Sequence, residues 1–447
     1  MDFTGVNVVV LGLAQSGLAA VELLVAQGAE VSACDVQPLD RLPEAAAALA
    51  RLQVPFRLQS REALADAAWI VLSPGVPIDL DLLQEARRRG AQVIGEVELA
   101  SYYLLGDIIG ITGSNGKTTT TALVGHMLAE CGIPVQVGGN IGTVPATAMV
   151  ATSRPGQWNV LELSSFQLET IQWFQAHIGV ELNITQDHLD RHHTFERYEA
   201  AKARLVETLG PLDWAVLNAD DPILSEFTMK TPGRLAWFSL TRKVTRGVWL
   251  DRDLLRLDGE PLIEAKDIPL RGRHNIENVM AASVVASLAG APIEGIAAAI
   301  RSFRAVEHRL EYVATVQGVD FYNDSKATNV DSTLKAIDAF DGGLWVILGG
   351  KDKGSDYSPL AAPLQAKARA ALLIGAATPL IAAGLAGAVQ IIECGTLENA
   401  VATAFRDASP GDTILLAPAC ASFDQFNNYE HRGRVFKELV ARLAAGR

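Results

Sequence analysis

A glycine-punctuated segment between an apolar run and a helix pattern carries the clearest chemistry in this sequence. It reads Gly110-Ile-Thr-Gly-Ser-Asn-Gly-Lys-Thr-Thr119 and follows the apolar pair Ile108-Ile109. Glycines let backbone N–H groups converge on phosphate oxygens, and the helix dipole adds partial positive charge. Lys117 can reach the β- and γ-phosphates of a nucleotide, and the Thr118 hydroxyl can bind Mg²⁺. We therefore predict a nucleoside triphosphate site at Gly113, Ser114, Asn115, Gly116, Lys117, Thr118 and Thr119.

The spacing of this segment departs by one position from the strict pattern G-x-x-x-x-G-K-[ST]. That pattern requires glycine at position 111, where this sequence has Ile111, and the glycine stands at 110 instead. The alternative interpretation is a glycine-rich turn that only starts a helix. The position of Gly-Lys-Thr between a strand pattern and a helix pattern favours the phosphate-binding loop.

Two polar groups follow predicted strands of the same region. Glu162 lies late in the apolar run Val160–Leu163, just before two serines, where it can bind Mg²⁺ or cap the next helix. Asp187 and His188 follow the predicted strand Gly179–Ile184, where they suit contact with metal or phosphate; a structural histidine is the alternative.

Three more candidates lie on predicted helices. Lys202 falls within a helix pattern and, on pattern alone, is an ordinary exposed lysine. Asn275 and Asn278 are three residues apart and share one helix face, so their amides can bind an adenine edge. The alternative is that they cap and begin the helix.

Polar loops follow three predicted strands of the last third of the chain. They are Asp324–Asn329, Gly349–Gly354 and Ala417–Phe426, and Arg309 stands where this third begins. Because ligands of open α/β sheets bind at the carboxyl ends of strands, three such loops predict a substrate site.

The elements that position these groups alternate between strands and helices throughout the chain. This alternation predicts an α/β fold with parallel, Rossmann-like sheets. We expect three domains at 1–95, 96–304 and 305–447, of which the second carries the phosphate-binding loop. In the first domain, the turn Gly12–Gly17 is either a phosphate turn or a packing turn, because position 14 is alanine and breaks the dinucleotide fingerprint.

Composition narrows the class of partners. The 447 residues are 49% hydrophobic and carry a net charge of −13, which argues against nucleic-acid binding. Four widely spaced cysteines fit reduced thiols in the cytoplasm, and they form neither a zinc motif nor a disulfide framework. The absence of a basic leader and of an 18-residue apolar run predicts no signal peptide and no membrane span.

Several of these motifs, taken in order, resemble those of the Mur ligase family. They are Ile111–Thr118, Glu162–Ser165, Asp187-His188, Gly272–Asn275, His308-Arg309, Asp324–Asn329 and Gly350–Lys353. The segments Ser73–Pro77, Ala417–Phe426 and Arg432-Gly433 are most similar to those of the D-glutamate-adding members. The resemblance covers essentially the whole chain and implies three domains: a Rossmann-like N-terminal domain, a central P-loop ATPase domain and a Rossmann-like C-terminal domain.

The resemblance also implies an activity. It is the ATP-dependent ligation of D-glutamate to UDP-N-acetylmuramoyl-L-alanine through an acyl phosphate, in the cytoplasm, by a monomer with neither nucleic-acid nor membrane partners. Lys117, His188 and Lys202 would be catalytic. Mg²⁺ would occupy two sites, formed by Thr118 and Glu162 and by His188 with a carbamylated Lys202.

Further residues take substrate roles by the same resemblance. The ATP contacts would include Asn275, Asn278, Arg309 and Asp324. The UDP-linked substrate would contact Asp35, Ser73 and Asn140. D-Glutamate would contact Lys326, Thr328, Lys353, Ser422 and Tyr429, the last through its backbone. Val36-Gln37 stand where polar residues are expected after Asp35, and Tyr429 replaces an expected phenylalanine.

Two alternatives remain at this stage. One is a ligase of the folylpolyglutamate type or another Mur ligase; a folylpolyglutamate ligase would lack the first block with Ser73-Pro-Gly-Val. The other is a regulatory P-loop module without ligase chemistry, which would have no use for the anion-binding loops of the last third.

Overall fold

The computed structural model describes residues 1–141, 144–304 and 306–446. The chain forms two compact units, which are described separately. The first comprises Met1–Glu264 with Val279–Ile300, and the second comprises Ala265–Asn278 with Arg301–Arg447. Within the described residues, the first unit contains two β-sheets and the second contains one.

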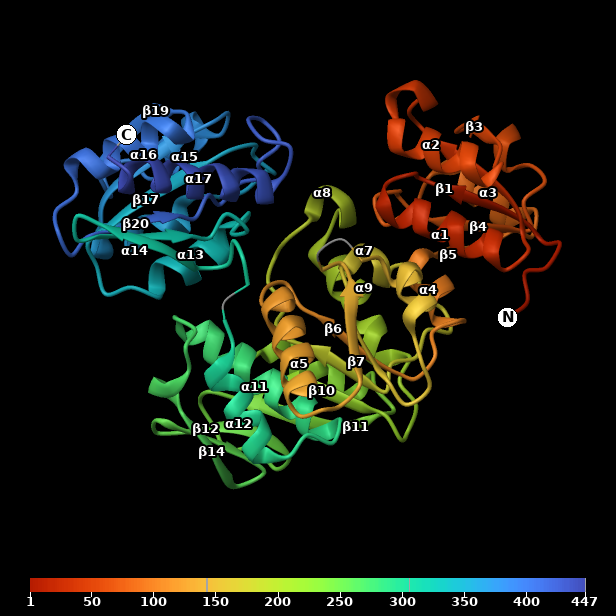
Figure 1. Ribbon diagram of the computed structural model, residues 1–447, viewed down its shortest axis with the longest axis horizontal. Helices are drawn as coiled ribbons and strands as arrows, with labels where there is room; N and C mark the ends of the chain where they lie inside the picture. Colours follow the sequence, from red (N-terminus) through yellow and green to blue (C-terminus); the bar gives the residue numbers. More distant parts are fainter. Residues whose placement is uncertain (142–143, 305, 447) are drawn as a thin grey trace. The chain divides into compact units, whose positions relative to one another are not determined.

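The first sheet contains five parallel strands in the order β3-β2-β1-β4-β5, shown in red and orange in Figure 1. Its strands are β1 (Asn7–Leu11), β2 (Glu30–Asp35), β3 (Phe56–Leu58), β4 (Trp69–Leu72) and β5 (Gln92–Gly95), and its helices are α1 (Gln15–Ala26), α2 (Pro43–Leu52) and α3 (Asp81–Arg88). Val8 and Val10 point into one apolar core, whereas Val9 and Leu11 point into another. Both faces of the sheet are therefore covered, which explains the continuous apolar runs of its strands.

The turn after β1 is held by close packing. A Cβ atom on Gly17 would lie 1.8 Å from the carbonyl oxygen of Gly12, so α1 starts directly against the end of β1. The Asp35 carboxylate accepts hydrogen bonds from the N–H groups of Leu13 (2.8 Å) and Gln37 (2.9 Å). The geometry supports the packing interpretation of the Gly12–Gly17 turn.

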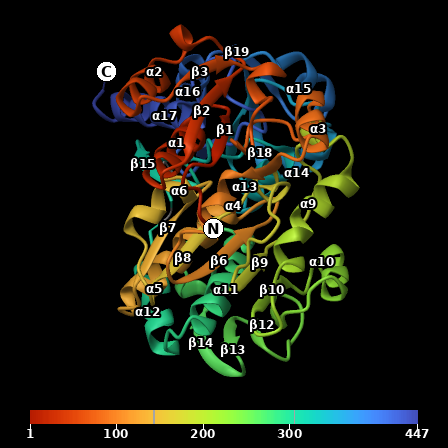
Figure 2. The same cartoon turned by 90° about the vertical axis from the view of Figure 1, so that its right-hand side faces the viewer.

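The second sheet contains nine strands in the order β14-β13-β12-β11-β10-β9-β6-β8-β7, of which β13 and β14 are antiparallel. Figure 2 shows β7, β8, β6, β9 and β10 side by side in that order. The strands are β6 (Asp107–Thr112), β7 (Val135–Gly139), β8 (Trp158–Glu162), β9 (Ile178–Glu181), β10 (Trp214–Asn218), β11 (Arg234–Ser239), β12 (Gly247–Asp251), β13 (Leu254–Leu257) and β14 (Glu260–Glu264). The helices are α4 (Glu96–Ser101), α5 (Lys117–Glu130), α6 (Ala146–Met149), α7 (Ser165–Leu168), α8 (Leu189–His192), α9 (Phe195–Glu207), α10 (Pro222–Glu226), α11 (Arg273–Leu288) and α12 (Ile293–Ser302).

The third sheet contains six strands in the order β15-β16-β20-β17-β18-β19, of which only β15 is antiparallel to its neighbour. The strands are β15 (Glu311–Val316), β16 (Val319–Asn323), β17 (Leu344–Gly349), β18 (Ala368–Ile374), β19 (Ile391–Gly395) and β20 (Thr413–Leu416). The helices are α13 (Val330–Asp338), α14 (Ala361–Lys367), α15 (Thr378–Gly384), α16 (Leu397–Asp407) and α17 (Tyr429–Ala444). Neighbouring β16, β20 and β17 each lead into one of the three predicted polar loops.

These sheets confirm the α/β class with parallel, Rossmann-like arrangements. The domain boundaries stay predictions, and the second one falls on residue 305, which lies outside the described residues. The strand predicted to reach Ile184 ends at Glu181 instead, because the N–H of Ile184 binds the Asp221 carboxylate rather than a neighbouring strand. Among the described helices, none combines the length and apolar composition needed to cross a bilayer.

Candidate functional site

The loop that the sequence predicts to bind phosphate lies between β6 and α5, at the end of a strand and the start of a helix. Gly116 caps α5 with a φ of 87°, and Gly113 has a φ of 149°. A Cβ atom at Gly113 would lie 2.8 Å from the Cβ of Leu182, so only glycine fits there. The Lys117 ammonium donates to the carbonyl oxygens of Gly113 and Ser114, each at 2.8 Å. The Lys117 side chain thus folds back onto the loop, and its ammonium lies where it is expected to contact the phosphates.

Side chains beyond the end of β9 hold this loop in place. The Asn183 carboxamide accepts from the N–H of Asn115 (2.9 Å) and donates to its carbonyl (3.1 Å). The Ser114 hydroxyl is within hydrogen-bonding distance of the Thr185 carbonyl (2.9 Å) and the Tyr198 hydroxyl (2.8 Å). The sequence analysis missed Asn183, Thr185 and Tyr198, although the position of Asn183 after a strand was an available signal.

Glu162 lies at the end of β8, beside the phosphate-binding loop. Its side chain is 1% exposed, and its Oε1 accepts a hydrogen bond from the Asn140 amide at 2.9 Å. The capping alternative is wrong, because Ser164 caps α7 in a capping box with Gln167. A buried carboxylate at this strand end suits a hard cation.

Lys202 is the side chain for which the pattern-based prediction was wrong. It is 1% exposed, and its ammonium donates to the Thr112 hydroxyl at 3.0 Å and lies 5.1 Å from the centre of the Tyr198 ring. Burial lowers the pKa of Lys202 to about 7, and the Lys117 charge acts in the same direction, whereas Glu181, Asp187 and Glu162 oppose it. The amine is therefore largely neutral just above neutral pH.

One of the charges that act on Lys202 belongs to Glu181. Glu181 is a second buried acid, after Glu162, and the sequence analysis missed it. Glu181 is 0% exposed, and neither of its carboxylate oxygens has a hydrogen-bond partner among the described residues. Burial raises the pKa of Glu181 to about 8, against the opposing effect of the Lys202 charge. Glu162, Glu181, Asp187, Lys117 and Lys202 thus form one centre of interacting ionisable side chains beside this loop.

His188 stands at the edge of this centre. It caps α8 with a left-handed φ of 54°, and its ring packs edge-on against Phe166 with 4.9 Å between ring centres. Its Nε2 lies 3.6 Å from an oxygen of Asp187. Three residues further on, Arg191 donates to the Glu169 carboxylate (2.7 Å) and to the Val76 carbonyl (2.9 Å). This arginine connects α8 with the Ser73–Pro77 turn.

Ser73 follows β4 at the carboxyl edge of the first sheet. It is 5% exposed, and its N–H donates to the Leu11 carbonyl at 3.0 Å. Its Cβ would lie 2.9 Å from a Cβ on Gly12, so the turns after β1 and β4 meet. This is the edge at which open α/β sheets bind ligands.

In the second unit, the two predicted adenine-binding asparagines contact each other. The Asn278 amide donates to Asn275 Oδ1 at 3.0 Å, and the Asn275 amide donates to the Arg271 carbonyl at 2.6 Å. Both side chains are nearly buried, at 5% and 7% exposure. Asn275 is the third residue of α11, so it lies in the first turn of the helix but does not cap it.

Arg309 and Asp324 also come together. Burial raises the pKa of Asp324 to about 6, while Arg309, the N–H of Leu310 and Lys326 act in the opposite direction. The carboxylate, the guanidinium and the Lys326 ammonium therefore share one region of the second unit.

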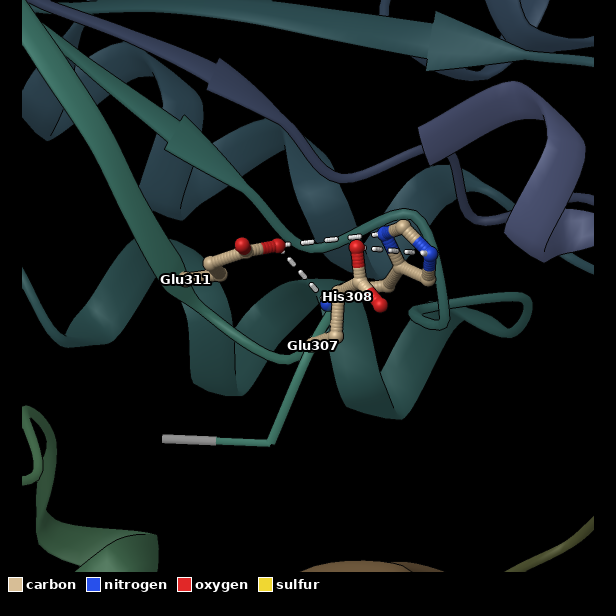
Figure 3. Close-up of side chains that lie close together, drawn as sticks. All are labelled: Glu307, His308 and Glu311. Atoms are coloured by element: carbon tan, nitrogen blue, oxygen red, sulfur yellow. Dashed lines mark hydrogen bonds and ion pairs between the residues drawn. The ribbon is translucent and has the colours of Figure 1, made fainter. Parts of the chain in front are cut away.

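His308, immediately before Arg309, lies in the cluster drawn in Figure 3. Its Nδ1 is 3.8 Å from Glu311 Oε2, and its Nε2 is 3.9 Å from Glu307 Oε1. These groups lie close enough for a metal ion, but the Lys437 ammonium already contacts Glu307 (2.8 Å) and Glu311 (2.6 Å). The Lys437 ammonium therefore takes the place that a metal ion would have between these carboxylates. We interpret the cluster as a structural contact that fixes the segment carrying Arg309.

The loops after β16 and β20 are joined by a buried arginine. Arg432 is 0% exposed and donates to the hydroxyl (3.0 Å) and carbonyl (2.8 Å) of Ser325 and to the Cys420 carbonyl (3.3 Å). The Ser325 hydroxyl donates to the Tyr429 carbonyl at 2.8 Å, and the Lys326 ammonium lies 5.0 Å from the Tyr429 ring centre. Lys326 and Tyr429, two of the residues predicted to contact the acceptor, therefore lie close together in this unit.

Family models match three consecutive segments of the chain. Residues 6–95 match the Mur ligase MurD-like N-terminal domain, residues 111–286 the Mur ligase middle domain, and residues 308–420 the Mur ligase glutamate ligase domain. Together with full-length relatives at up to 60% identity among those compared, these matches show that the chain belongs to the Mur ligase family.

Two curated relatives, both covered over nearly their full length, carry the same protein name. The UDP-N-acetylmuramoylalanine--D-glutamate ligase of Solibacter usitatus is 60% identical, over 98% of this chain and 98% of the relative. The protein of the same name from Koribacter versatilis is 48% identical, over 99% of each chain.

Solved structures share the fold. A UDP-N-acetylmuramate-alanine ligase from Thermotoga maritima aligns with a TM-score of 0.62 at 17% identity, over 99% of this chain and 100% of that one. A pseudomurein peptide ligase type C from Methanothermus fervidus aligns with a TM-score of 0.62 at 19% identity, over 98% and 100%. At these identities the likeness supports the fold alone.

Proposed function

We propose that this chain joins D-glutamate to UDP-N-acetylmuramoyl-L-alanine with the hydrolysis of ATP to ADP and phosphate, a step of peptidoglycan synthesis. The observation that carries the proposal is the 60% identity, over nearly the full length of both chains, to a relative named for this reaction. Membership of the Mur ligase family makes the chain an ATP-dependent enzyme that forms amide bonds. The phosphate-binding loop beside buried Glu162 and Lys202 is consistent with that chemistry.

The reaction begins with phosphoryl transfer. The substrate carboxylate attacks the γ-phosphorus of ATP, the bond to the β-phosphate oxygen breaks, and an acyl phosphate and ADP result. Lys117 and the N–H groups of residues 113–119 stabilise the charge on the transferring group, because they are already oriented before the reaction. We assign ATP contacts to Asn275, Asn278, Arg309 and Asp324 as well.

The donor set fits Mg²⁺. Glu162 offers a carboxylate and Thr118 a hydroxyl, and hard oxygen ligands are those that Mg²⁺ prefers. We propose that these two residues hold one ion and that His188 and Lys202 hold a second. When bound, the ions neutralise the phosphate charge and polarise the transferring group.

We propose that Lys202 serves this second site as a carbamate. The buried amine, whose pKa lies at about 7, can attack carbon dioxide in its neutral form. An N–C bond forms, one proton leaves the nitrogen, and the product is an anion with two oxygen ligands. An ammonium would repel Mg²⁺, whereas the carbamate has the charge and the donor atoms that Mg²⁺ requires.

The second step forms the amide bond. The neutral D-glutamate amine attacks the acyl phosphate carbonyl carbon and forms a C–N bond; the nitrogen loses a proton to solvent, and the tetrahedral intermediate breaks its C–O bond to release phosphate. We assign the acceptor to Lys326, Thr328, Lys353, Ser422 and the backbone of Tyr429. Lysine ammonium groups and hydroxyls suit the two carboxylates of the amino acid. Asp35, Ser73 and Asn140 are assigned to the UDP-linked substrate.

We further propose that the enzyme acts as a monomer in the cytoplasm. The four cysteines form no disulfide, which fits a reducing compartment. ATP and nucleotide-linked sugars are also metabolites of the cytoplasm.

The assay that tests this function is phosphate release against a panel of UDP-linked muramyl substrates and amino acids. We expect release to require both UDP-N-acetylmuramoyl-L-alanine and D-glutamate. Equal turnover with L-glutamate or meso-diaminopimelate would contradict the assignment, and release without any amino acid would indicate a simple ATPase.

A further inference from the structure

The turn that carries Lys353 is pressed against the loop that carries Ser422. Lys351 and Ala421 exchange two backbone hydrogen bonds, at 2.8 and 3.1 Å. A Cβ atom at Gly350 would lie 2.2 Å from the Ala421 carbonyl oxygen, so no side chain fits between the two segments. The direction of the Lys353 side chain therefore depends on how this turn is fixed at its other end.

A buried tyrosine fixes that end. The Tyr357 hydroxyl donates to Asp352 Oδ1 at 2.6 Å and lies 3.0 Å from the Cys420 sulfur. Because the single hydroxyl proton goes to the carboxylate, the Cys420 thiol is the donor in the second contact. The Asp352 carboxylate in turn accepts from the N–H groups of Gly354 (2.9 Å) and Ser355 (3.2 Å).

These contacts form a continuous chain from one loop to the other. It runs from Cys420, two residues before Ser422, through Tyr357 to Asp352 and the N–H groups that follow Lys353. Tyr357 is 3% exposed and Cys420 is 1% exposed, so water does not compete for the hydroxyl. The Lys353 ammonium itself makes no hydrogen bond or ion pair with the residues that the structure describes, so it remains available to a ligand.

We propose that Tyr357 is a positioning residue for the acceptor amino acid, whose hydroxyl aligns the Lys353 turn with the Ser422 loop. This inference rests on the proposed function, because it takes the ligand of Lys353 and Ser422 to be a dicarboxylic amino acid. The ammonium and the serine hydroxyl can bind one molecule only if the turn and the loop keep a constant separation. Loss of the hydroxyl frees the turn while the tyrosine ring stays in the core.

The substitution Tyr357→Phe removes this hydroxyl and retains the ring. We expect the KM for D-glutamate to rise about tenfold, the effect of losing one hydrogen bond to a charged group. The KM for ATP and for the UDP-linked substrate should stay within about twofold, as should kcat, because the phosphoryl-transfer residues are untouched. Steady-state kinetics with each substrate varied in turn measures these values.

Tyr322→Phe is the matched control. Tyr322 is 5% exposed and belongs to the same apolar core as Tyr357, but its hydroxyl makes no hydrogen bond in the described residues. All three KM values should stay at the wild-type level in this variant. A rise in the D-glutamate KM of Tyr322→Phe equal to that of Tyr357→Phe would overturn the inference, because any disturbance of this core would then suffice.

A double-mutant cycle tests the route through Asp352. Asp352→Asn should also raise the D-glutamate KM, and combining it with Tyr357→Phe should add little, because both remove the same contact. Fully additive effects would contradict the proposed chain.

The failure of this inference is distinguishable from the failure of the proposed function. If the wild-type enzyme releases no phosphate in response to D-glutamate, the function itself is wrong. If the wild-type enzyme responds but Tyr357→Phe leaves the D-glutamate KM unchanged, only the role of Tyr357 is wrong.

Discussion

At the scale of single residues, burial changes the chemistry of two ordinary side chains in the first unit. Lys202 and Glu181 are both inaccessible to water, and their pKa values shift toward the neutral forms, to about 7 and about 8. Desolvation dominates both shifts, although the two charges partly stabilise each other. A lysine with a neutral amine at physiological pH is a nucleophile rather than a fixed cation.

The proposed carbamate of Lys202 leads to a rescue experiment. Lys202→Ala should be nearly inactive, because the substitution removes the carbamate oxygens that bind the metal. It also leaves a gap of about the size of the lost carbamate. Acetate or formate should restore part of the activity, since each supplies a carboxylate that can occupy the gap. Chloride at equal ionic strength is the control and should restore nothing.

A direct signal for the modification complements the rescue. Wild-type protein equilibrated with ¹³C-labelled bicarbonate should show a carbamate carbon resonance that is absent from Lys202→Ala. Full activity in the alanine variant, or an identical spectrum in both proteins, would refute the carbamate.

Glu181 predicts a pH-dependent stability. Its pKa rises from an ordinary value of 4.5 to about 8 in the folded chain, so both states bind the proton below pH 4.5. Between pH 4.5 and pH 8 only the unfolded state releases it, so the folded state loses stability as pH rises, by at most about 1.4 kcal/mol per pH unit. The Glu181→Gln variant lacks this titration and should gain stability relative to wild type across that window.

Urea unfolding at pH 4.5, 6 and 8 measures the difference. Glu294→Gln, which alters an exposed carboxylate of the same unit, should track the wild-type curve. A free-energy difference between Glu181→Gln and wild type that is constant with pH would show that Glu181 does not titrate in this range.

At the scale of elements, the strand-to-helix turn after β6 forms the loop at which we propose that phosphate binds. The turn must pass between α5 and the segment after β9, and Gly113 allows this with a φ of 149° and no side chain. Asn183 then holds the turn from the adjoining segment. The geometry of the loop is thus set jointly by β6 and β9.

Gly113→Ala tests that geometry. The added Cβ meets Leu182 at 2.8 Å in a backbone conformation nearly restricted to glycine. We expect the free energy of unfolding to fall by about 1–3 kcal/mol and the affinity for ATP to fall with it. Gly75→Ala is the stability control, since its Cβ would meet no atom within 4 Å and should change stability by less than about 1 kcal/mol. Wild-type stability and ATP affinity in Gly113→Ala would contradict this account.

At the scale of the whole molecule, the chain forms two units with separate apolar cores. Units that each bury their own core can unfold independently. We expect scanning calorimetry to show more than one transition, or a van't Hoff enthalpy below the calorimetric enthalpy. A single transition with equal enthalpies would show that the two units unfold cooperatively.

The sequence by itself predicted the alternation of strands and helices, the glycine-rich loop between a strand and a helix, and Glu162 at the end of its strand. These features depend on local patterns: apolar runs, glycine positions, and the polar residue that follows a strand. The family resemblance and its assigned substrates also follow from sequence, because motif order is preserved along the chain. The roles assigned to single residues from that resemblance stay predictions.

The tertiary structure alone decided the burial of Lys202 and of Glu181, and the contacts of Asn183 and Tyr357. Lys202 sits in a helix pattern that gives no sign of burial, yet α9 turns it toward Thr112, ninety residues earlier in the chain. Tyr357 meets Cys420 across sixty-three residues. Burial and hydrogen-bond partners depend on segments that are distant in sequence. Burial determines whether a lysine is a cation or a nucleophile, and the partners determine whether a tyrosine hydroxyl supports a binding site.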